Sequence, residues 1–268
     1  MPKPASPKII DLELTAYCNT ACAFCPREKL TRPQGFMSAM TLDKVLSGLK
    51  QEPPYIINCS GMGECLLHPR LPELIRQIKR SLNCIVGLTT NGSLLDEKNC
   101  RRLLNTPLDF FTISYNGSRR VLQNIRQLAR LRQRTGHRPA LNITTLEHVP
   151  KKKLYDFWSS AGVDGVIRQP LHNRGGHLKT RQKRVFTKPC AILNNSLFIT
   201  WQGRVLSCCH DLEGKNILGD LTKEPLAKIL RQRAPYLSRL NPYPLCRACN
   251  DTLRAQYFSK ERYLACKK

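Results

Sequence analysis

The stretch IIDLELTAYCNTACAFC, residues 9–25, is the most informative part of this 268-residue chain. An apolar run, Ile9–Leu14, has the composition of a strand, and Cys18, Cys22 and Cys25 follow it in the spacing Cys-x3-Cys-x2-Cys. Cysteine thiolates hold iron–sulfur clusters, usually four at a time. Three of them on one short loop leave one iron open for a ligand, just as an open position distinguishes catalytic from structural metal sites. The spacing therefore predicts a catalytic 4Fe–4S cluster on Cys18, Cys22 and Cys25.

A zinc site is the alternative use of these three thiols. It needs a fourth cysteine or a histidine close by, and the next histidine is His68. The spacing also resembles the signature of the radical S-adenosylmethionine (SAM) superfamily, Cys-x3-Cys-x-aromatic-Cys, in which Phe24 takes the aromatic position. This resemblance implies that SAM binds the open iron and is cleaved reductively to methionine and a 5′-deoxyadenosyl radical, which removes a hydrogen atom from the substrate.

Length and composition exclude several classes of protein. A chain of 268 residues, 41% of them hydrophobic, holds one large domain, or a large and a small one, with an ordinary core. The first residues lack the apolar region of a signal peptide, and no apolar run approaches the roughly 18 residues that a membrane span needs. We therefore expect a soluble, cytoplasmic protein without membrane contact, whose 13 cysteines serve metal or redox chemistry rather than disulfides.

The net charge of +25 is unevenly distributed. No Asp or Glu occurs in residues 110–146 or 165–210, whereas both segments are rich in arginine. Such positive fields attract anions, which include phosphorylated small molecules, nucleotide-linked sugars and nucleic acid. A basic, solvated surface is the alternative. We favour it for the arginine-rich helix expected near residues 119–134, whose apolar stripe leaves most arginines outside.

Strand-like apolar runs alternate with helical patterns up to Gln169. The expected strands are Ile9–Leu14, Tyr55–Cys59, Cys84–Thr90, Phe110–Ser114, Ala140–Thr144 and Val163–Gln169. The expected helices are Leu42–Leu49, Leu71–Arg80, Glu97–Leu104, Val121–Arg134 and Lys152–Ser160, with Thr41 capping the first and Pro72 in the first turn of the second. This alternation predicts an α/β fold of parallel βαβ units. Six units fall short of the eight of a closed barrel, so we expect a partial (β/α)6 TIM-like barrel, in agreement with the resembled superfamily.

A second, cysteine-bearing unit follows the barrel. Residues 170–188 have the composition of a loop, and a β-hairpin is expected from Ser196–Thr200 and Arg204–Cys208. We place the boundary near residue 180, with the barrel in residues 1–180 and a small cysteine-rich domain of a hairpin plus a helix in residues 181–268.

Four cysteines of this unit form a second metal-binding pattern: Cys190, then Gly203-x4-Cys208, then Cys246-x2-Cys249. Four thiolates in two pairs suit zinc as well as iron–sulfur. The pattern resembles the auxiliary-cluster, or twitch, domain of radical SAM enzymes, which implies a second 4Fe–4S cluster. The longer SPASM pattern carries two auxiliary clusters and needs two further cysteines after Cys249. Only Cys266 remains there, so we expect one auxiliary cluster.

Cys209 adjoins Cys208 and is its competitor as a ligand, although the Gly-x4-Cys spacing favours Cys208. The other cysteines are expected to be small buried or surface thiols: Cys59, Cys65, Cys84, Cys100 and Cys266.

The superfamily resemblance also implies a set of SAM contacts. Met62-Gly63-Glu64 follows the second strand, where the superfamily has a Gly-Gly-Glu that binds the SAM amino group, and Met62 departs from that pattern. Asn91 and Ser114 end the third and fourth strands and would lie near the SAM ribose or carboxylate. The alternative for Asn91 and Ser114 is an ordinary turn residue.

The loop His172-Asn173-Arg174-Gly175-Gly176-His177 follows the sixth strand and should lie over the open end of the barrel. Its glycines allow close approach of a ligand, and Arg174 can hold an oxygen through two parallel hydrogen bonds. His172 and His177 are candidates for a general base. The loop resembles that of twitch-type alcohol dehydrogenases acting on aminocyclitols, and an arginine-rich surface linker is the alternative.

The sequence thus predicts a radical SAM oxidoreductase. It would oxidise a hydroxyl of a small, sugar- or cyclitol-like, anionic substrate, with the auxiliary cluster as electron acceptor and a flavodoxin- or ferredoxin-type protein as reductant. A peptide-modifying maturase and a nucleic-acid-modifying enzyme are alternatives with the same domains, although no RNA-binding motif is visible. A zinc-bound nucleic-acid-binding protein is the alternative from a different class.

Overall fold

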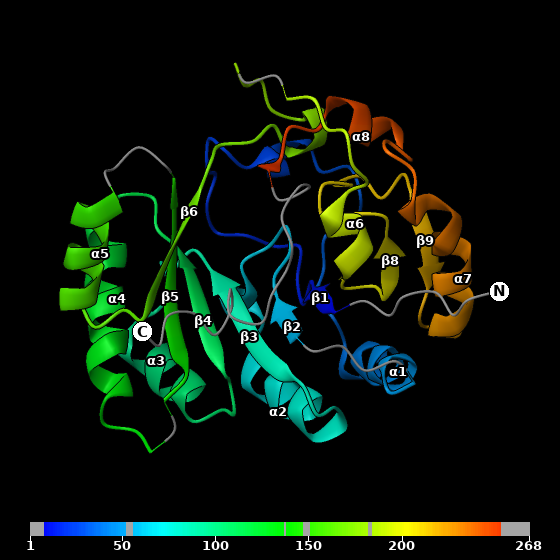
Figure 1. Ribbon diagram of the computed structural model, residues 1–268. Helices are drawn as coiled ribbons and strands as arrows, with labels where there is room; N and C mark the ends of the chain where they lie inside the picture. Colours follow the sequence, from blue (N-terminus) through cyan, green and yellow to red (C-terminus); the bar gives the residue numbers. More distant parts are fainter. Residues whose placement is uncertain (1–7, 52–55, 137, 147–150, 182–183, 253–268) are drawn as a thin grey trace.

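The computed structural model describes residues 8–51, 56–136, 138–146, 151–181 and 184–252. Its described strands form one sheet in the order β6-β5-β4-β3-β2-β1-β7-β8-β9 (Figure 1). No helix in these ranges is long and apolar enough to cross a membrane.

Six parallel strands form the first part of the sheet and pair in chain order. They are β1 (Ile9–Leu12), β2 (Ile56–Cys59), β3 (Ile85–Thr90), β4 (Phe110–Ser114), β5 (Ala140–Leu146) and β6 (Gly165–Gln169). The connecting helices are α1 (Ala39–Leu49), α2 (Leu71–Ser81), α3 (Glu97–Leu104), α4 (Arg119–Arg132) and α5 (Lys151–Ser160). The predicted partial barrel of six βα units is confirmed. Tyr55, the expected start of the second strand, lies outside the described residues.

The C-terminal part adds a small antiparallel region. It contains α6 (Ala191–Asn195), β7 (Ser196–Ile199), β8 (Arg204–Leu206), β9 (Ile217–Asp220), α7 (Leu226–Leu237) and α8 (Pro244–Ala248). The expected hairpin is present as β7 and β8. The sequence did not reveal that β7 also pairs in parallel with β1, with Ile10 opposite Leu197, so that the second part extends the sheet of the first. The domain boundary near residue 180 stays a prediction.

The hydrophobic core forms because each element presents one apolar face. In α2 the buried residues Leu71, Leu74, Ile75 and Ile78 recur at the spacing of one helical face. Strand β2 is buried along its whole length, as parallel strands covered on both faces are. Figure 1 shows α2 to α5 along the outer side of the strands, which leaves the inner side for the site.

One local prediction was wrong. The first helix begins earlier than expected, because Ser38 and not Thr41 is its cap: the Ser38 Oγ accepts the Thr41 N–H at 3.0 Å. Most arginines near α4 are exposed as expected, whereas Arg132 is fully buried. It pairs with Asp164 and donates to the carbonyls of Pro139 and Gly162, both at 2.8 Å, so its charge is compensated inside the fold.

The inner side of the barrel carries linked polar side chains. The Asn58 amide donates to Asp11 at 3.0 Å and accepts from the Thr89 hydroxyl at 3.1 Å, which joins β1, β2 and β3. The pKa of Asp11 is raised to about 7, mainly by burial and to a smaller extent by the nearby Cys209. The interior of the barrel is therefore polar beneath the site.

Candidate active site

The cluster loop, residues 13–37, joins β1 to α1. The Glu64 N–H donates to the Tyr17 carbonyl at 2.8 Å just before the first cysteine. Gly63 packs so closely here that a Cβ would lie 2.3 Å from the Thr15 oxygen and 2.5 Å from the Tyr17 oxygen. Only glycine fits such an approach, so the Gly63-Glu64 segment fixes where the cluster loop starts.

The three thiols of this loop are partly exposed, and two of them lie close to one hydroxyl. The Thr20 Oγ1 is 3.4 Å from the Cys18 sulfur and 3.6 Å from the Cys22 sulfur, and the Cys25 N–H donates to the Cys22 carbonyl at 2.9 Å. Three thiols on one loop fit the cluster with three protein ligands that their spacing predicts.

Glu64 and Asn91 lie beside the loop but serve the chain itself. The Glu64 carboxylate is buried and accepts from Leu66 N at 3.0 Å, Thr90 Oγ1 at 2.7 Å and Asn91 N at 2.7 Å. The Asn91 amide donates to Asn19 Oδ1 at 3.0 Å. Burial raises the pKa of Glu64 although these hydrogen bonds oppose the shift. Contacts of Met62, Gly63, Glu64 and Asn91 with SAM stay predictions.

A buried ion pair that the sequence analysis missed holds the other side of the loop. Arg32 Nη1 donates to the carboxylate of Glu13 at 2.7 Å, and Arg32 Nε donates to the Leu212 carbonyl at 2.9 Å. Glu13 is fully buried and also accepts the Met62 N–H at 3.0 Å. Arg32 thereby attaches the middle of the cluster loop to the first residue of the loop, directly after β1, and to the C-terminal part of the chain. Glu13, one of two acids within the otherwise apolar run Ile9–Leu14, was the available signal.

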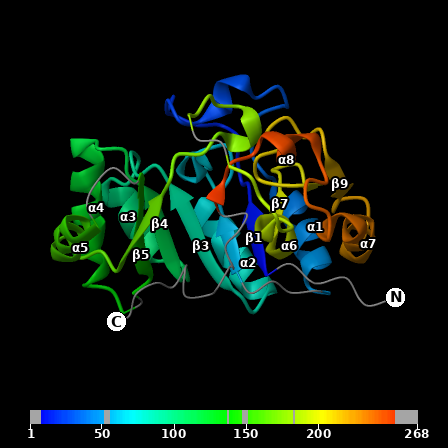
Figure 2. The same cartoon turned by 45° about the horizontal axis from the view of Figure 1, so that its top comes forward.

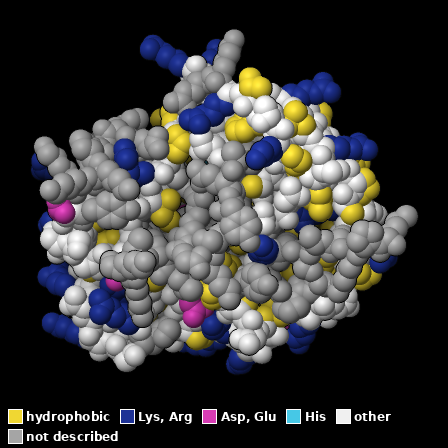
Figure 3. All heavy atoms as spheres, viewed as in Figure 1, with side chains coloured by type: hydrophobic (Ala, Val, Ile, Leu, Met, Phe, Trp, Pro, Cys, Tyr) yellow, Lys and Arg dark blue, Asp and Glu magenta, His cyan; other side chains and the backbone are white. Residues whose placement is uncertain are grey.

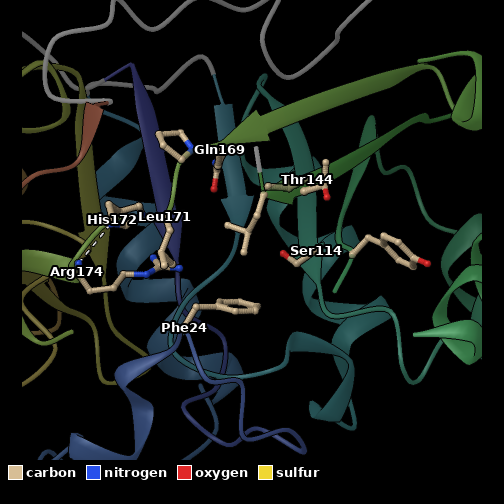
Figure 4. Close-up of a pocket in the computed structure, with 11 residues that line it drawn as sticks. Phe24, Ser114, Thr144, Gln169, Leu171, His172 and Arg174 are labelled. Atoms are coloured by element: carbon tan, nitrogen blue, oxygen red, sulfur yellow. Dashed lines mark hydrogen bonds between the residues drawn. The ribbon is translucent and has the colours of Figure 1, made fainter. Parts of the chain in front are cut away.

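A pocket opens at the carboxyl ends of β4, β5 and β6. Its volume is about 480 Å³ with the open mouth included. Figure 4 shows seven of its lining residues with labels: Phe24, Ser114, Thr144, Gln169, Leu171, His172 and Arg174. Four of these were singled out from the sequence, and the structure brings them together from separate segments: Phe24, Ser114, His172 and Arg174. His177, Asn91 and Met62–Glu64 do not line it.

The loop that carries Arg174 is tightly bent. Arg174 itself has φ 51°, and Gly175 and Gly176 follow with φ 68° and 97°. A left-handed arginine is unusual and costs conformational energy, which suggests that its position is functionally constrained. The Arg174 N–H points back to His172 Nδ1 at 3.4 Å (Figure 4). Figure 2 shows this turn, η3 (Arg174–Gly176), between the cluster loop and α8. Lys29 of the cluster loop also donates to the His177 carbonyl at 2.6 Å.

His172 is neutral and held by protein groups. Burial, followed by the charge of Arg174, lowers the pKa of His172 to about 4 against the opposing effect of Asp251. Its Nε2 lies 3.8 Å from the Asp251 carboxylate, and the same oxygen is 2.8 Å from His210 Nε2. The assignment of His172 or His177 as a general base stays a prediction.

The second set of cysteines surrounds one cavity. Cys190, Cys208, Cys246 and Cys249 all line a hollow of about 310 Å³, together with Ser207, His210 and Tyr243. Cys190 directly precedes α6, and Cys208 follows β8. Cys246 lies in α8, and Cys249 directly follows it. Cys209 does not line it, and its sulfur lies instead 4.0 Å from His210 Nδ1. Four converging thiols fit a cluster with a complete set of protein ligands. Cys59, Cys65, Cys84 and Cys100 are buried as expected, and Cys266 lies outside the described residues.

Comparison with known families settles the class. The model of the radical SAM superfamily matches residues 12–164. The chain belongs to the radical SAM superfamily. The model of an iron–sulfur cluster-binding domain, SPASM, matches residues 190–250. As a radical SAM protein with this second domain, the chain uses a 4Fe–4S cluster with SAM and carries an additional iron–sulfur site. Whether that site holds one auxiliary cluster stays a prediction.

Curated relatives cover only part of the chain. The tungsten-containing aldehyde ferredoxin oxidoreductase cofactor-modifying protein of Pyrococcus furiosus is 24% identical over 180 residues, which are 60% of this chain and 50% of the relative. A probable GTP 3′,8-cyclase of Methanococcus maripaludis is 36% identical over 104 residues, 38% of this chain and 34% of the relative. The chain thus spans half or less of the length of these radical SAM relatives.

Two solved structures share the fold over most of this radical SAM chain. BtrN, in complex with AdoMet and 2-DOIA, superposes with a TM-score of 0.69 at 19% identity and covers 97% of this chain and 98% of BtrN. SuiB of Streptococcus suis, bound to the precursor peptide SuiA, has a TM-score of 0.69 at 13% identity and covers 91% of this chain and 70% of SuiB. At such identities the likeness establishes the fold.

Proposed function

We propose that this radical SAM enzyme oxidises a hydroxyl group of a small, sugar- or cyclitol-like substrate that carries phosphate or a nucleotide, with the auxiliary cluster as electron acceptor. The observation that carries the proposal is the position of the pocket between the two cysteine sites. Phe24 brings the cluster loop to the pocket. His172 lines the pocket and faces Asp251, whose other neighbour, His210, lines the auxiliary cavity.

The spacing of the cysteines, and the cavity that four of them line, support the following cofactor ligands. Cys18, Cys22 and Cys25 hold the cluster that binds SAM, and Cys190, Cys208, Cys246 and Cys249 hold the auxiliary cluster. When bound, SAM and its cluster supply a hydrogen-abstracting radical, and the auxiliary cluster supplies a one-electron acceptor. The substrate carbinol then loses one hydrogen atom, one electron and one proton and becomes a carbonyl.

The pocket residues bind and orient the substrate. The side chains of Ser114, Thr144 and Gln169 offer hydroxyl and amide groups at the ends of three neighbouring strands, which suits a ligand rich in hydroxyls. Arg174 holds a substrate oxygen or phosphate through its planar fork. His172 keeps the Arg174 backbone in place and is the candidate to accept the hydroxyl proton.

The lining of the pocket favours a small, hydroxyl-rich molecule over a peptide, because Ser114, Thr144 and Gln169 offer polar groups at three strand ends. The likeness to peptide-bound SuiB keeps peptide modification as the second candidate. Figure 3 shows Lys and Arg side chains spread over the visible face with few acids, a surface that suits an acidic flavodoxin- or ferredoxin-type reductant. A zinc-bound nucleic-acid-binding protein does not fit the family.

The test is product analysis with anaerobically reconstituted enzyme, SAM, a reductant and a panel of sugar phosphates, nucleotide sugars and cyclitols. We expect one substrate to yield a product two mass units lighter, with one 5′-deoxyadenosine per carbonyl formed. A peptide that is modified while every small polyol remains unchanged would replace this proposal with the second candidate.

A further inference from the structure

Three buried polar side chains near the auxiliary cavity carry donor atoms without a hydrogen-bond partner among the described residues. Among described residues, the Ser207 hydroxyl, the Tyr243 hydroxyl, and Nε and Nη1 of Arg233 lack a hydrogen-bond partner. Ser207 is only 3% exposed, Tyr243 8% and Arg233 1%. A buried donor without an acceptor costs about 1–3 kcal/mol. Four such donor atoms on three side chains in one small region therefore require an acceptor that these residues do not supply.

Two of these three side chains lie in the wall of the cavity itself. Ser207 and Tyr243 line the same hollow as Cys190, Cys208, Cys246 and Cys249. Ser207 directly precedes Cys208, and Tyr243 is the residue before α8, which carries Cys246. The Tyr243 ring stacks on Tyr236 with ring centres 5.1 Å apart, which restricts the direction of its hydroxyl.

Arg233 supplies a positive charge behind this wall. It extends from α7, and its Nη2 donates to the Ser196 carbonyl at 3.0 Å and to the carbonyl of Leu193, a residue that lines the cavity. Burial lowers the pKa of Arg233 to about 10, which leaves it charged at neutral pH. A buried charge of this kind is costly unless a negative group lies close by. A cluster held by four thiolates is such a group.

We propose that the hydroxyls of Ser207 and Tyr243 donate hydrogen bonds to the sulfur atoms of the auxiliary cluster, and that they and the charge of Arg233 raise its reduction potential. The inference rests on the proposed auxiliary cluster and names the residues that tune it. Hydrogen bonds to sulfur and nearby charge are established means by which proteins set such potentials. A higher potential favours transfer of the electron from the substrate to this cluster.

The experiment isolates the auxiliary cluster in the full chain with Cys18, Cys22 and Cys25 replaced by Ala. Its midpoint potential is measured by redox titration followed by electron paramagnetic resonance. Tyr243→Phe is expected to lower the equilibrium constant for reduction roughly tenfold, about 59 mV for one electron, and Ser207→Ala is expected to lower it as well. Tyr236→Phe is the matched control, because it removes the hydroxyl of the stacked ring, which does not line the cavity. It should leave the potential unchanged.

The inference would be overturned if Tyr243→Phe and Ser207→Ala both retained about four irons and both kept the midpoint potential of the parent chain. If a variant loses its cluster, resonance Raman spectra of the unmodified auxiliary site in H₂O and D₂O decide instead. Bound hydroxyl donors shift the iron–sulfur stretching bands on deuteration, and bands that do not shift would refute the donors. If the parent chain, without Cys18, Cys22 and Cys25, bound no iron, the proposed auxiliary cluster itself would be wrong. That result is distinct from a test of the hydroxyl donors.

Discussion

Asn173 and Asn250 bind each other through backbone and side chain in both directions. The Asn173 N–H donates to Asn250 Oδ1 at 2.7 Å, and the Asn250 N–H donates to Asn173 Oδ1 at 3.2 Å. The Asn173 amide also donates to the Ala248 carbonyl at 2.6 Å. Asn173 precedes Arg174, and Asn250 follows Cys249. The pair therefore attaches the pocket loop to the segment proposed to bind the auxiliary cluster.

Replacing Asn250 with Ala should loosen the pocket loop. It removes the acceptor of the Asn173 N–H, and loss of a buried hydrogen bond costs about 1–3 kcal/mol. We expect amide exchange in residues 173–178 to accelerate at least about tenfold by hydrogen–deuterium exchange mass spectrometry. The exposed Asn83→Ala is the control and should change nothing. Unchanged exchange in Asn250→Ala would mean that the loop is held by other contacts.

Replacing Cys18, Cys22 and Cys25 with Ala should remove one of two clusters. Reconstituted protein is expected to hold about eight irons, and the triple variant about four. The variant should form no 5′-deoxyadenosine from SAM, as measured by liquid chromatography. Cys100→Ala, at a buried thiol of α3, should retain all the iron. SAM cleavage by the triple variant would refute the assignment of these three ligands.

Cys208→Ala should lose the auxiliary cluster, whereas Cys209→Ala should retain it. Cys208 lines the cavity with the other three cysteines, and Cys209 does not. Iron content and the electron paramagnetic resonance signal of the auxiliary site measure the difference. The opposite pattern, with iron lost only from Cys209→Ala, would reverse the choice of ligand.

Replacing Arg174 with Lys should impair the reaction with the true substrate. The charge remains but the planar fork is lost, so kcat/KM should fall about 30-fold or more, equivalent to about 2 kcal/mol of transition-state binding. SAM cleavage without substrate should change little. Arg181→Lys, an exposed position of the same basic segment, is the control. Normal kinetics in Arg174→Lys would identify the loop as a linker.

Asp11→Asn should flatten the dependence of stability on pH. The pKa of Asp11 is raised from 3.8 to about 7, so between these values the folded protein holds a proton that the unfolded chain has lost. Stability therefore falls as pH rises towards 7, by at most about 4 kcal/mol. Melting temperatures from pH 5 to 8 should fall more steeply for the wild type and for the exposed Asp156→Asn than for Asp11→Asn. Parallel curves for all three proteins would contradict the shifted pKa.

The sequence by itself determined the features that depend on local spacing. Strand and helix periodicities predicted the six βα units, because an element buries its apolar face wherever that face recurs at the period of the element. The spacings around Cys18 and Cys190 marked both cysteine sites, and their resemblance to known families implied iron–sulfur clusters. Boundaries were less certain, as the helix that starts at Ser38 shows.

Only the tertiary structure decided how distant segments meet. The pairing of β7 with β1, the contact of Asn173 with Asn250 and the ion pair between Glu13 and Arg32 depend on the path of the whole chain. Single residues such as Asn250 and Tyr243 carry no periodic signal that would mark them in advance. Burial is likewise a property of the folded chain, because it removes water from a group only after other elements have packed around it. The unpartnered donors at the auxiliary cavity became visible only for that reason.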